Sequence, residues 1–315
     1  MKAAQIRKYG DAGVVTIAPD APRPSAGGGR VLVEIHAASL NPADSAIRAG
    51  YMHAMAPLQF PATLGLDIAG TIAETDPGVG WLKAGDRVYG SASVFAGATG
   101  AFAEYAAVPA GLLAMAPKKL SFTEAAALPL AGICALQAIY EALKVGKGTR
   151  ILIHGGSGGI GTFAVQMAKG VGAHVAATCR GSAEGYVKKL GADEVVDFEK
   201  SSFQSLLHDY DAVLDTRGGE VYAGSFSVLK KGGSIVTFAA QPDAERAAKH
   251  QVTALPLRGE VTTSRLDRLA KLVNDGTVKV YIHGVFPLEK IRDAFIARES
   301  GKVLGKVVLS IREKA

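Results

Sequence analysis

The sequence is poor in cysteine and has no long apolar segments. Its 315 residues include two cysteines, Cys134 and Cys179, which are too few for a disulfide framework and favour a reducing compartment. No apolar run approaches the ~20 residues that a membrane-spanning helix needs. The first residues also lack the apolar segment of a secretory signal. We therefore expect a cytoplasmic protein with no membrane partner.

Aromatic residues are scarce as well, at 7% of the chain. The formal net charge is +6, but the lysines and arginines are scattered along the sequence. No basic segment carries the interleaved aromatic residues of a nucleic-acid groove, so a nucleic-acid partner is not expected. With 48% hydrophobic and 20% charged residues, the composition is typical of a globular enzyme, and the length suits two domains.

Glycine, in contrast, is abundant, and one glycine-rich segment is the most informative feature of the chain. An apolar run at 151–153 leads through His154 into this segment, which is followed by a helical pattern. Glycines permit a tight turn and a close approach of phosphate to the backbone, while the helix start offers unpaired N–H groups to an anion. The pattern predicts a dinucleotide-binding βαβ unit. Its candidate contacts are Gly155, Ser157, Gly158, Gly159, Ile160 and Gly161.

The second strand of this unit indicates which dinucleotide binds. An NAD site usually places an acid about 20 residues after the loop, where it bonds the ribose hydroxyls. Here the chain carries Arg180 and Ser182 instead, and the first acid is Glu184. An arginine offers a fork of donors to a 2′-phosphate. We therefore predict NADP(H), bound by Arg180 and Ser182 with Tyr186 or Lys189 as weaker contacts, although Arg180 as an ordinary surface arginine is the alternative.

The order of elements predicts an α/β protein. Short strands broken by turns fill the first ~120 residues, and strands alternate with helices after Thr123, which is typical of a doubly wound parallel sheet. A single helix is expected at 123–143, and a tail of two helices and further strands follows residue 256. The expected strands lie at 31–36, 68–74, 87–89, 101–108, 150–154, 174–178, 194–197, 211–215, 234–239, 278–285 and 306–311. Asp215, Phe238 and Ala239 end two of the parallel strands, where ligands of such sheets bind.

Three segments taken together resemble the zinc-independent quinone oxidoreductase branch, related to zeta-crystallin, of the medium-chain dehydrogenase/reductase superfamily. They run from Asn41-Pro42-Ala43-Asp44 to the glycine at 70, from 100 through Ala125-Ala126-Ala127-Leu128-Pro129 to the glycine-rich loop, and over 305–309. The resemblance implies a GroES-like catalytic domain built from 1–122 and 257–315, with a Rossmann domain at 123–256. It also implies a homodimer.

The same resemblance bears on metal chemistry. The positions that hold catalytic zinc in the alcohol dehydrogenases of the superfamily correspond to Asn41, Leu66 and approximately Leu130, which are not a zinc ligand set. No cysteines stand near 91–104, where the structural zinc loop of those relatives would fall. We therefore expect no metal, and simple alcohol oxidation is the less favoured chemistry because no Lewis acid would stabilise an alkoxide.

The resemblance also implies roles for individual residues. Asn41 would lie close to the nicotinamide and orient the substrate carbonyl or a water, with a turn-forming Asn-Pro as the alternative. Tyr51 would be the proton donor, since related enoyl reductases use a tyrosine just after this glycine, and His53 is a second candidate acid. Cys134 and Lys306 would approach the cofactor, or else serve as a buried apolar residue and a strand-edge lysine.

Structural roles are expected for three charged residues, which are Asp44, Arg48 and Asp67. Asp44 and Arg48 stand four positions apart and are expected to form a helical ion pair. Asp67 is expected to anchor its own loop through hydrogen bonds.

A pocket for an apolar acceptor would be lined by four side chains, or these would simply pack in the core. They are Tyr51, Met52, Met55 and Phe95.

The favoured function is NADPH-dependent hydride transfer to a quinone or an α,β-unsaturated carbonyl. Such acceptors contain their own electron sink, so hydrogen-bond donors suffice to stabilise the developing charge. Reduction of a ketone, an aldehyde or a 2-enoyl thioester on the same scaffold is one alternative. A second is a structural or regulatory protein that binds NADPH without catalysis, because fold alone does not fix function.

Overall fold

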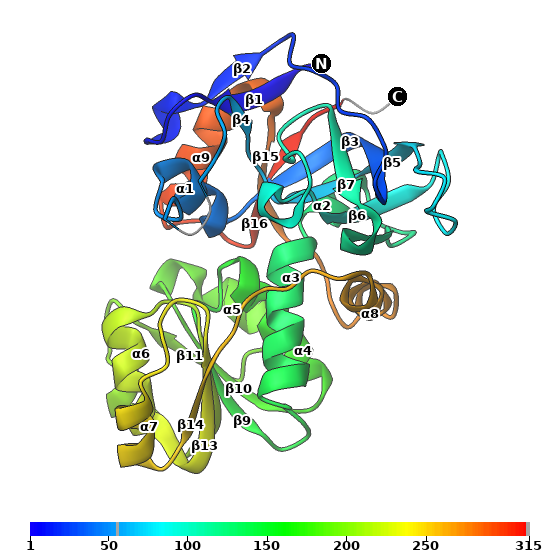
Figure 1. Ribbon diagram of the computed structural model, residues 1–315. Coiled ribbons are helices and arrows are strands. Elements are labelled where there is room, and N and C mark those ends of the chain that lie inside the picture. Colours follow the sequence, from blue (N-terminus) through cyan, green and yellow to red (C-terminus); the bar gives the residue numbers. More distant parts are fainter. Residues whose placement is uncertain (55–56, 313–315) are drawn as a thin grey trace. The chain divides into compact units, whose positions relative to one another are not determined.

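The computed structural model describes residues 1–54 and 57–312, which form two compact units (Figure 1). The first unit comprises Met1–Leu130, Val261–Asn274 and Val280–Ala315, and the second comprises Ala131–Glu260 and Asp275–Lys279. Segments from both ends of the chain therefore belong to the first unit. Within the described part of the chain, no helix is both long and apolar enough to cross a membrane.

The first unit is rich in antiparallel strands. One sheet has the order β15-β16-β3-β5-β6-β8, with β7 also paired to β3, and a small sheet has the order β2-β1-β4. Helices α1 (Pro42–Ala49), α2 (Phe122–Ala126), α8 (Thr263–Asn274) and α9 (Ile291–Glu299) complete the unit. The strands are β1 (Ala3–Ile6), β2 (Thr16–Ala18), β3 (Arg30–Leu40), β4 (Ala62–Thr63), β5 (Asp67–Glu74), β6 (Arg87–Ser91), β7 (Tyr105–Pro109), β8 (Leu113–Met115), β15 (Ile282–Pro287) and β16 (Lys306–Ser310).

Helix α1 follows directly from β3 and illustrates how local sequence defines an element. Pro42 occupies its first turn, where the missing N–H removes no helical hydrogen bond. The Asn41 N–H donates to the Asp44 side chain at 2.7 Å. Gly50 ends the helix with φ 86°, a left-handed conformation that suits glycine. These signals fix the position of Asn41 at the junction of strand and helix.

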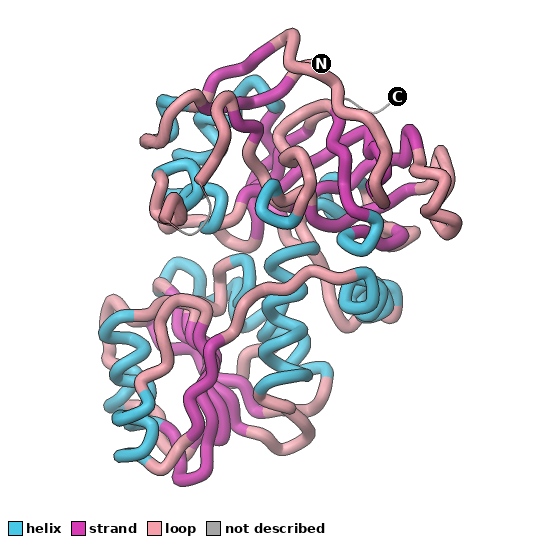
Figure 2. The backbone as a smooth tube through the Cα atoms, in the orientation of Figure 1, coloured by secondary structure: helices cyan, strands magenta, loops and turns pink. Residues whose placement is uncertain are grey.

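The second unit is a parallel six-stranded sheet in the order β11-β10-β9-β12-β13-β14. Helices flank the sheet on both sides (Figure 2). Its strands are β9 (Arg150–His154), β10 (His174–Cys179), β11 (Glu194–Asp197), β12 (Tyr210–Asp215), β13 (Leu229–Thr237) and β14 (Thr253–Pro256). Its helices are α3 (Pro129–Leu136), which begins at the unit boundary, α4 (Gly159–Gly170), α5 (Glu184–Lys189), α6 (Gly219–Ser225) and α7 (Ala244–His250). The expected α/β class is confirmed.

The expected single helix at 123–143 is wrong. The chain forms α2, a break, α3 and then a π-helix at Gln137–Ala142. Pro129 explains the break because it has no N–H to continue the helix and disfavours a helical conformation at the residue before it. As the first residue of α3 it is well tolerated.

Several expected strands have different bounds, and β3 and β6 continue to Leu40 and Ser91, beyond the expected 31–36 and 87–89. The strand expected at 101–108 begins only at Tyr105, because the N–H groups of Ala101 and Phe102 bond to the loop at Gly65 and Leu64 instead of to the large sheet. The strand expected at 234–239 extends over 229–237, and the one expected at 278–285 lies at 282–287.

Candidate functional site

The glycine-rich loop connects β9 to α4 in the second unit. Gly155 has φ 72°, a conformation that L side chains rarely adopt. A Cβ at position 161 would lie 2.2 Å from the Gly155 carbonyl oxygen and 2.7 Å from the Gly156 Cα. Only glycine therefore fits at position 161. Because the first N–H groups of α4 have no helical acceptor, the loop is a cradle that fits the pyrophosphate of a dinucleotide.

The sequence did not predict a role for a buried histidine, His154, beneath this loop. The His154 ring nitrogens lie 3.2 Å from the Thr178 Oγ1 and 2.9 Å from the Ser225 Oγ. The Thr178 Oγ1 also accepts the Gly155 N–H at 3.2 Å. Burial lowers the pKa of His154 to about 4, so the ring is neutral near pH 7 and supports the loop without adding charge. No sequence signal distinguished it from an apolar residue at a strand end.

Arg180 stands just after β10, as the sequence predicts for a residue that contacts a ribose phosphate. Its Nη1 donates to the Glu199 Oε1 at 2.6 Å, and its guanidinium lies 5.7 Å from the centre of the Phe198 ring. Ser182 is exposed in the following turn, and the Tyr186 hydroxyl lies 2.9 Å from the Thr162 Oγ1. Arg180 is partly exposed, so its guanidinium is accessible to an anion once it leaves Glu199.

Asp215 is occupied by its own turn. It is fully buried, and its carboxylate accepts the N–H groups of Arg217 and Gly218 and the hydroxyl of Thr237. It is therefore a structural residue in this arrangement and offers no free oxygen to a cofactor.

Three other predicted cofactor contacts differ in exposure. Ala239 is exposed and Phe238 is partly exposed after the end of β13. Cys134 lies in α3 and is 4% exposed. Phe238 and Ala239 thus remain accessible candidates, whereas Cys134 has the burial expected of its structural alternative.

The first unit contains a buried polar cluster around Asn41, which is 2% exposed. The Asn41 Nδ2 donates to the Asp67 Oδ2 at 2.9 Å, and its Oδ1 accepts from the Lys306 Nζ at 2.5 Å. The Lys306 Nζ also donates to the Leu40 carbonyl at 3.1 Å and lies 3.5 Å from the Asp67 carboxylate. Lys306 is 3% exposed, so it is not the strand-edge lysine of the alternative interpretation.

Asp67 begins β5, and its side chain bonds to residues of other segments, whereas bonds to its own loop were expected from the sequence. Its Oδ2 accepts the Ser39 hydroxyl at 3.0 Å, and its Oδ1 accepts the Leu130 N–H at 3.0 Å. Burial lowers the pKa of Lys306, and the neighbouring Asp67 opposes this change. The two opposite charges therefore compensate each other inside the unit.

The expected ion pair between Asp44 and Arg48 is wrong. The Arg48 Nη1 lies 2.9 Å from the Glu299 Oε1, and its Nε donates to the Gly10 carbonyl. Asp44 instead caps the start of α1 by accepting the Asn41 N–H. Capping draws its side chain towards the N-terminus of the helix and away from the residue one turn later.

Asp44 is buried, and its Oδ1 has no hydrogen-bond partner among the described residues. Burial raises its pKa from the ordinary 3.8 to about 7. Between these values the folded chain keeps a proton that the unfolded chain has released. This carboxyl therefore contributes stability that is complete below its ordinary pKa and is lost as the pH rises through about 7.

Asp44→Asn should remove this pH dependence, because the amide oxygen still accepts the Asn41 N–H and no buried charge forms. Between pH 6 and pH 8 the free energy of unfolding of the native chain should fall by about 1.4 kcal/mol more than that of the variant. Urea unfolding at both pH values measures the difference. Asp76→Asn is the control, since its pKa is lowered by the Gly78 N–H and it is charged at both. Equal pH dependence in the native chain and Asp44→Asn would contradict the expectation.

Two of the other predicted acceptor residues, Tyr51 and Phe95, are exposed on the first unit. Tyr51 is 85% exposed, and the His53 Nδ1 lies 3.1 Å from the Tyr9 hydroxyl. Met52 is partly buried against the core and Phe95 is 38% exposed, whereas Met55 lies outside the described residues. An exposed tyrosine of this kind has a hydroxyl that solvent can reprotonate.

The zinc positions suggested by the resemblance do not fit a zinc ion. Leu66 packs in the apolar core, and the Asn41 amide is bonded to the Lys306 ammonium, which already places a positive charge there. Among residues 1–54 and 57–312, no three His, Cys, Asp or Glu side chains form a group that could hold a metal. Zinc is bound in proteins by these nitrogen, sulfur and carboxylate donors.

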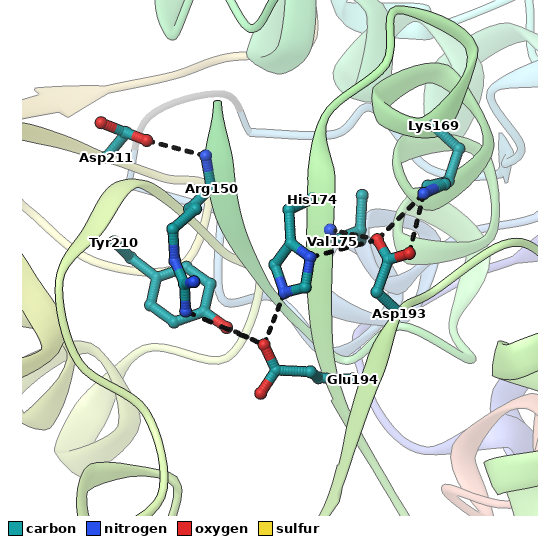
Figure 3. Close-up of polar contacts among 8 residues, drawn as sticks. All are labelled: Arg150, Lys169, His174, Val175, Asp193, Glu194, Tyr210 and Asp211. Atoms are coloured by element: carbon teal, nitrogen blue, oxygen red, sulfur yellow. Dashed lines mark hydrogen bonds and ion pairs between the residues drawn. The ribbon is translucent and has the colours of Figure 1, made fainter. Parts of the chain in front are cut away.

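A second polar cluster lies at the starts of the parallel strands, at the opposite end of β9 from the glycine loop (Figure 3). Glu194 accepts from the Tyr210 hydroxyl at 3.0 Å and lies 2.5 Å from the His174 Nε2. The Arg150 N–H donates to Asp211 at 2.7 Å. Burial, with Glu194 beside it, raises the pKa of Tyr210. These contacts join the beginnings of four strands, so we assign them a structural role.

Comparison with known proteins identifies relatives that share this two-unit architecture. Residues 27–118 match the family model described as alcohol dehydrogenase GroES-like domain, and residues 190–309 match the one described as zinc-binding dehydrogenase. The chain is 33% identical to a chloroplast envelope quinone oxidoreductase homolog from Arabidopsis thaliana, with 98% of each chain covered. It is 34% identical to an NADPH-dependent alkenal/one oxidoreductase of the same plant, with 98% of this chain and 79% of the relative covered.

A solved structure agrees with these relatives. The quinone oxidoreductase from Coxiella burnetii superimposes with a TM-score of 0.93 at 32% identity, with 99% of each chain covered. The chain therefore belongs to the medium-chain dehydrogenase/reductase superfamily, with quinone oxidoreductases among its relatives. The resemblance and the GroES-like and Rossmann fold expected from the sequence are confirmed.

Proposed function

We propose that this protein is a zinc-independent, NADPH-dependent reductase of quinones or α,β-unsaturated carbonyl compounds. The observation that carries the proposal is the Asn41–Lys306–Asp67 cluster, in which Asn41 stands at a position that corresponds to a zinc ligand and its amide is bonded to a carboxylate and an ammonium group. Such a site suits an acceptor that needs only hydrogen-bond donors. The quinone oxidoreductase and alkenal/one oxidoreductase relatives support this class of acceptor.

NADP(H) fits the second unit, and when bound it supplies the hydride. Residues 155–161 would hold its pyrophosphate, because Gly155 and Gly161 leave the backbone open to phosphate oxygens. Arg180 would exchange the Glu199 carboxylate for the 2′-phosphate, with Ser182 beside it. Tyr186 in α5, and Phe238 and Ala239 just after β13, remain proposed contacts. The NADPH-dependent relative supports this choice of cofactor.

Asn41 and Tyr51 have different proposed roles in the reaction. The Asn41 amide would donate a hydrogen bond to the acceptor oxygen on which negative charge develops. Tyr51 would deliver the proton that completes the reduction. Since Tyr51 is 85% exposed, water can replace its proton, and its contribution is the smaller of the two.

Asn41→Ala should therefore lower kcat for enone reduction by about 10- to 100-fold, because it removes a donor that acts on the developing oxyanion. The dissociation constant of NADPH should change less than about 2-fold. Tyr51→Phe should lower kcat by less than about 10-fold, since solvent protonates the product in its place. Steady-state kinetics and calorimetry on the three proteins measure these effects. A larger loss in Tyr51→Phe than in Asn41→Ala would reverse the assignment.

A substrate panel tests the proposed function itself. Protein dialysed against a chelator is mixed with NADPH and an enone, a quinone, a ketone, an aldehyde or a 2-enoyl thioester, and the products are identified. The proposal expects turnover of the enone or quinone, with the carbonyl of the enone intact. Alcohol products would favour ketone or aldehyde reduction, and preferred turnover of the thioester would favour an enoyl reductase. Tight NADPH binding without turnover would favour a structural or regulatory protein.

A homodimer and a cytoplasmic location also belong to the proposal. Strand β14 ends the parallel sheet and pairs within the described chain with β13, which leaves an edge on which a second copy can dock. Both cysteines are buried and unbridged, as expected in a reducing compartment. Sedimentation equilibrium that shows only the 32.5 kDa monomer would contradict the dimer.

A further inference from the structure

The Asn41 side chain at the start of α1 bonds to charged residues outside that helix. Asparagine at this position usually accepts a backbone N–H of the first turn, and Asn41 forms such a capping box with Asp44. The Asn41 amide also donates to Asp67 and accepts from Lys306, and Ser39 bonds to Asp67 in turn. Helix capping therefore does not account for the two buried charged partners of this side chain.

The two ends of the Asn41 amide contact groups of opposite charge. Its Nδ2 donates to the Asp67 carboxylate and its Oδ1 accepts from the Lys306 ammonium. Rotation of the amide by 180° would place its NH₂ group against the ammonium and its oxygen against the carboxylate. Both contacts would become repulsive inside the unit, where charges are weakly screened. The charge pair therefore permits one orientation only.

The partners themselves cannot turn away from the amide. Asp67 is fully buried and is bonded by Ser39 and Leu130, and Lys306 is bonded by the Leu40 carbonyl. An asparagine NH₂ group has two N–H bonds, and one of them donates a hydrogen bond to Asp67. In this fixed orientation the amide oxygen is bonded to Lys306, and the second N–H is not used by Asp67 or Lys306.

We propose that Asp67 and Lys306 are positioning residues, which fix the Asn41 amide so that it presents an N–H to the acceptor. This inference rests on the proposed function, because it requires Asn41 to act on the acceptor. It gives Lys306 a role through Asn41 in place of direct contact with the cofactor. The pair would then affect the rate of reduction without affecting the affinity for NADPH.

The test is a double-mutant cycle with Lys306→Met/Asp67→Asn, which removes both charges together and leaves no lone buried charge. In the native background the variant should lower kcat by at least about 10-fold, with the KM of the enone and the Kd of NADPH changed less than about 2-fold. In the Asn41→Ala background the same change should lower kcat less than about 2-fold further. Lys2→Met/Glu289→Gln removes an exposed ion pair of the same unit and should leave all three quantities unchanged.

The outcomes separate this inference from the proposed function. An equal loss of kcat in both backgrounds would show that the pair acts independently of Asn41, and would overturn the inference while the role of Asn41 stands. An unchanged kcat in Asn41→Ala would overturn the role of Asn41 and the inference with it.

If circular dichroism shows that Lys306→Met/Asp67→Asn does not fold, Ser39→Ala takes its place, because it removes only one hydrogen bond to Asp67. Ser39→Ala should lower kcat about 2- to 5-fold in the native background and leave the kcat of Asn41→Ala unchanged. An equal loss of kcat in both backgrounds would overturn the inference.

Discussion

Gly161→Ala is expected to weaken NADPH binding by at least about 100-fold, which corresponds to about 2.7 kcal/mol. The added Cβ would lie 2.2 Å from the Gly155 carbonyl oxygen and 2.7 Å from the Gly156 Cα. Both are backbone atoms, so the methyl group cannot be accommodated by a change of side-chain rotamer. The loop must move away from the start of α4, which disrupts the cradle of N–H groups proposed to hold the pyrophosphate. Titration calorimetry with NADPH measures the loss.

Gly146→Ala is the matched control for this variant. It makes the same chemical change in the same unit, but a Cβ at position 146 meets no atom within 4 Å. We expect it to bind NADPH within about 2-fold of the native chain, since the space is open. Unfolding experiments on both variants separate a loss of binding from a loss of folding. Native affinity in a folded Gly161→Ala protein would show that the cofactor does not bind at this loop.

Arg180→Gln is expected to lower the preference for NADPH over NADH by about 10- to 100-fold. Hydrogen bonds to a charged group contribute about 1.5–3 kcal/mol, and Arg180 is the proposed partner of the 2′-phosphate that distinguishes the two cofactors. The affinity for NADPH should fall while that for NADH changes little. The ratio of the two dissociation constants, measured by calorimetry at one ionic strength, is the relevant quantity.

Glu199 provides a second arm of the same experiment. Its carboxylate accepts from the Arg180 guanidinium at 2.6 Å and therefore competes with a phosphate for the same donors. Glu199→Gln should raise the NADPH preference, opposite in sign to Arg180→Gln. Arg246→Gln removes an exposed arginine that is paired with Asp243 in the same unit, and it should leave the ratio unchanged. An unchanged ratio in Arg180→Gln would assign the phosphate to other residues.

The sequence predicted best those elements that depend on local pattern. Strand β11 lies at the expected residues 194–197, and helix α4 follows the glycine loop as expected. In both places an apolar run is bounded by turn residues within a few positions, so residues close in sequence determine the secondary structure. The helix expected at 123–143 failed because apolar spacing outweighed Pro129, whose missing N–H interrupts the helix.

The contacts of the candidate site were less accessible to prediction because they join distant parts of the chain. Lys306 and Asn41 are 265 residues apart in sequence, yet they share a hydrogen bond inside the first unit. The chemistry of each residue was visible in the sequence, but its partner was not. His154 under the glycine loop was missed for the same reason, since its contacts to Thr178 and Ser225 come from later strands and helices.

Transfer of deuterium from NADPH labelled at the nicotinamide C4 to an enone tests the central claim most directly. The protein is first treated with a chelator, and the product is analysed by mass spectrometry and NMR. Our account predicts a saturated ketone with deuterium on the carbon β to the carbonyl and a rate that added zinc does not change. Deuterium on the carbinol carbon of an alcohol, or activity that returns only when zinc is added, would contradict it.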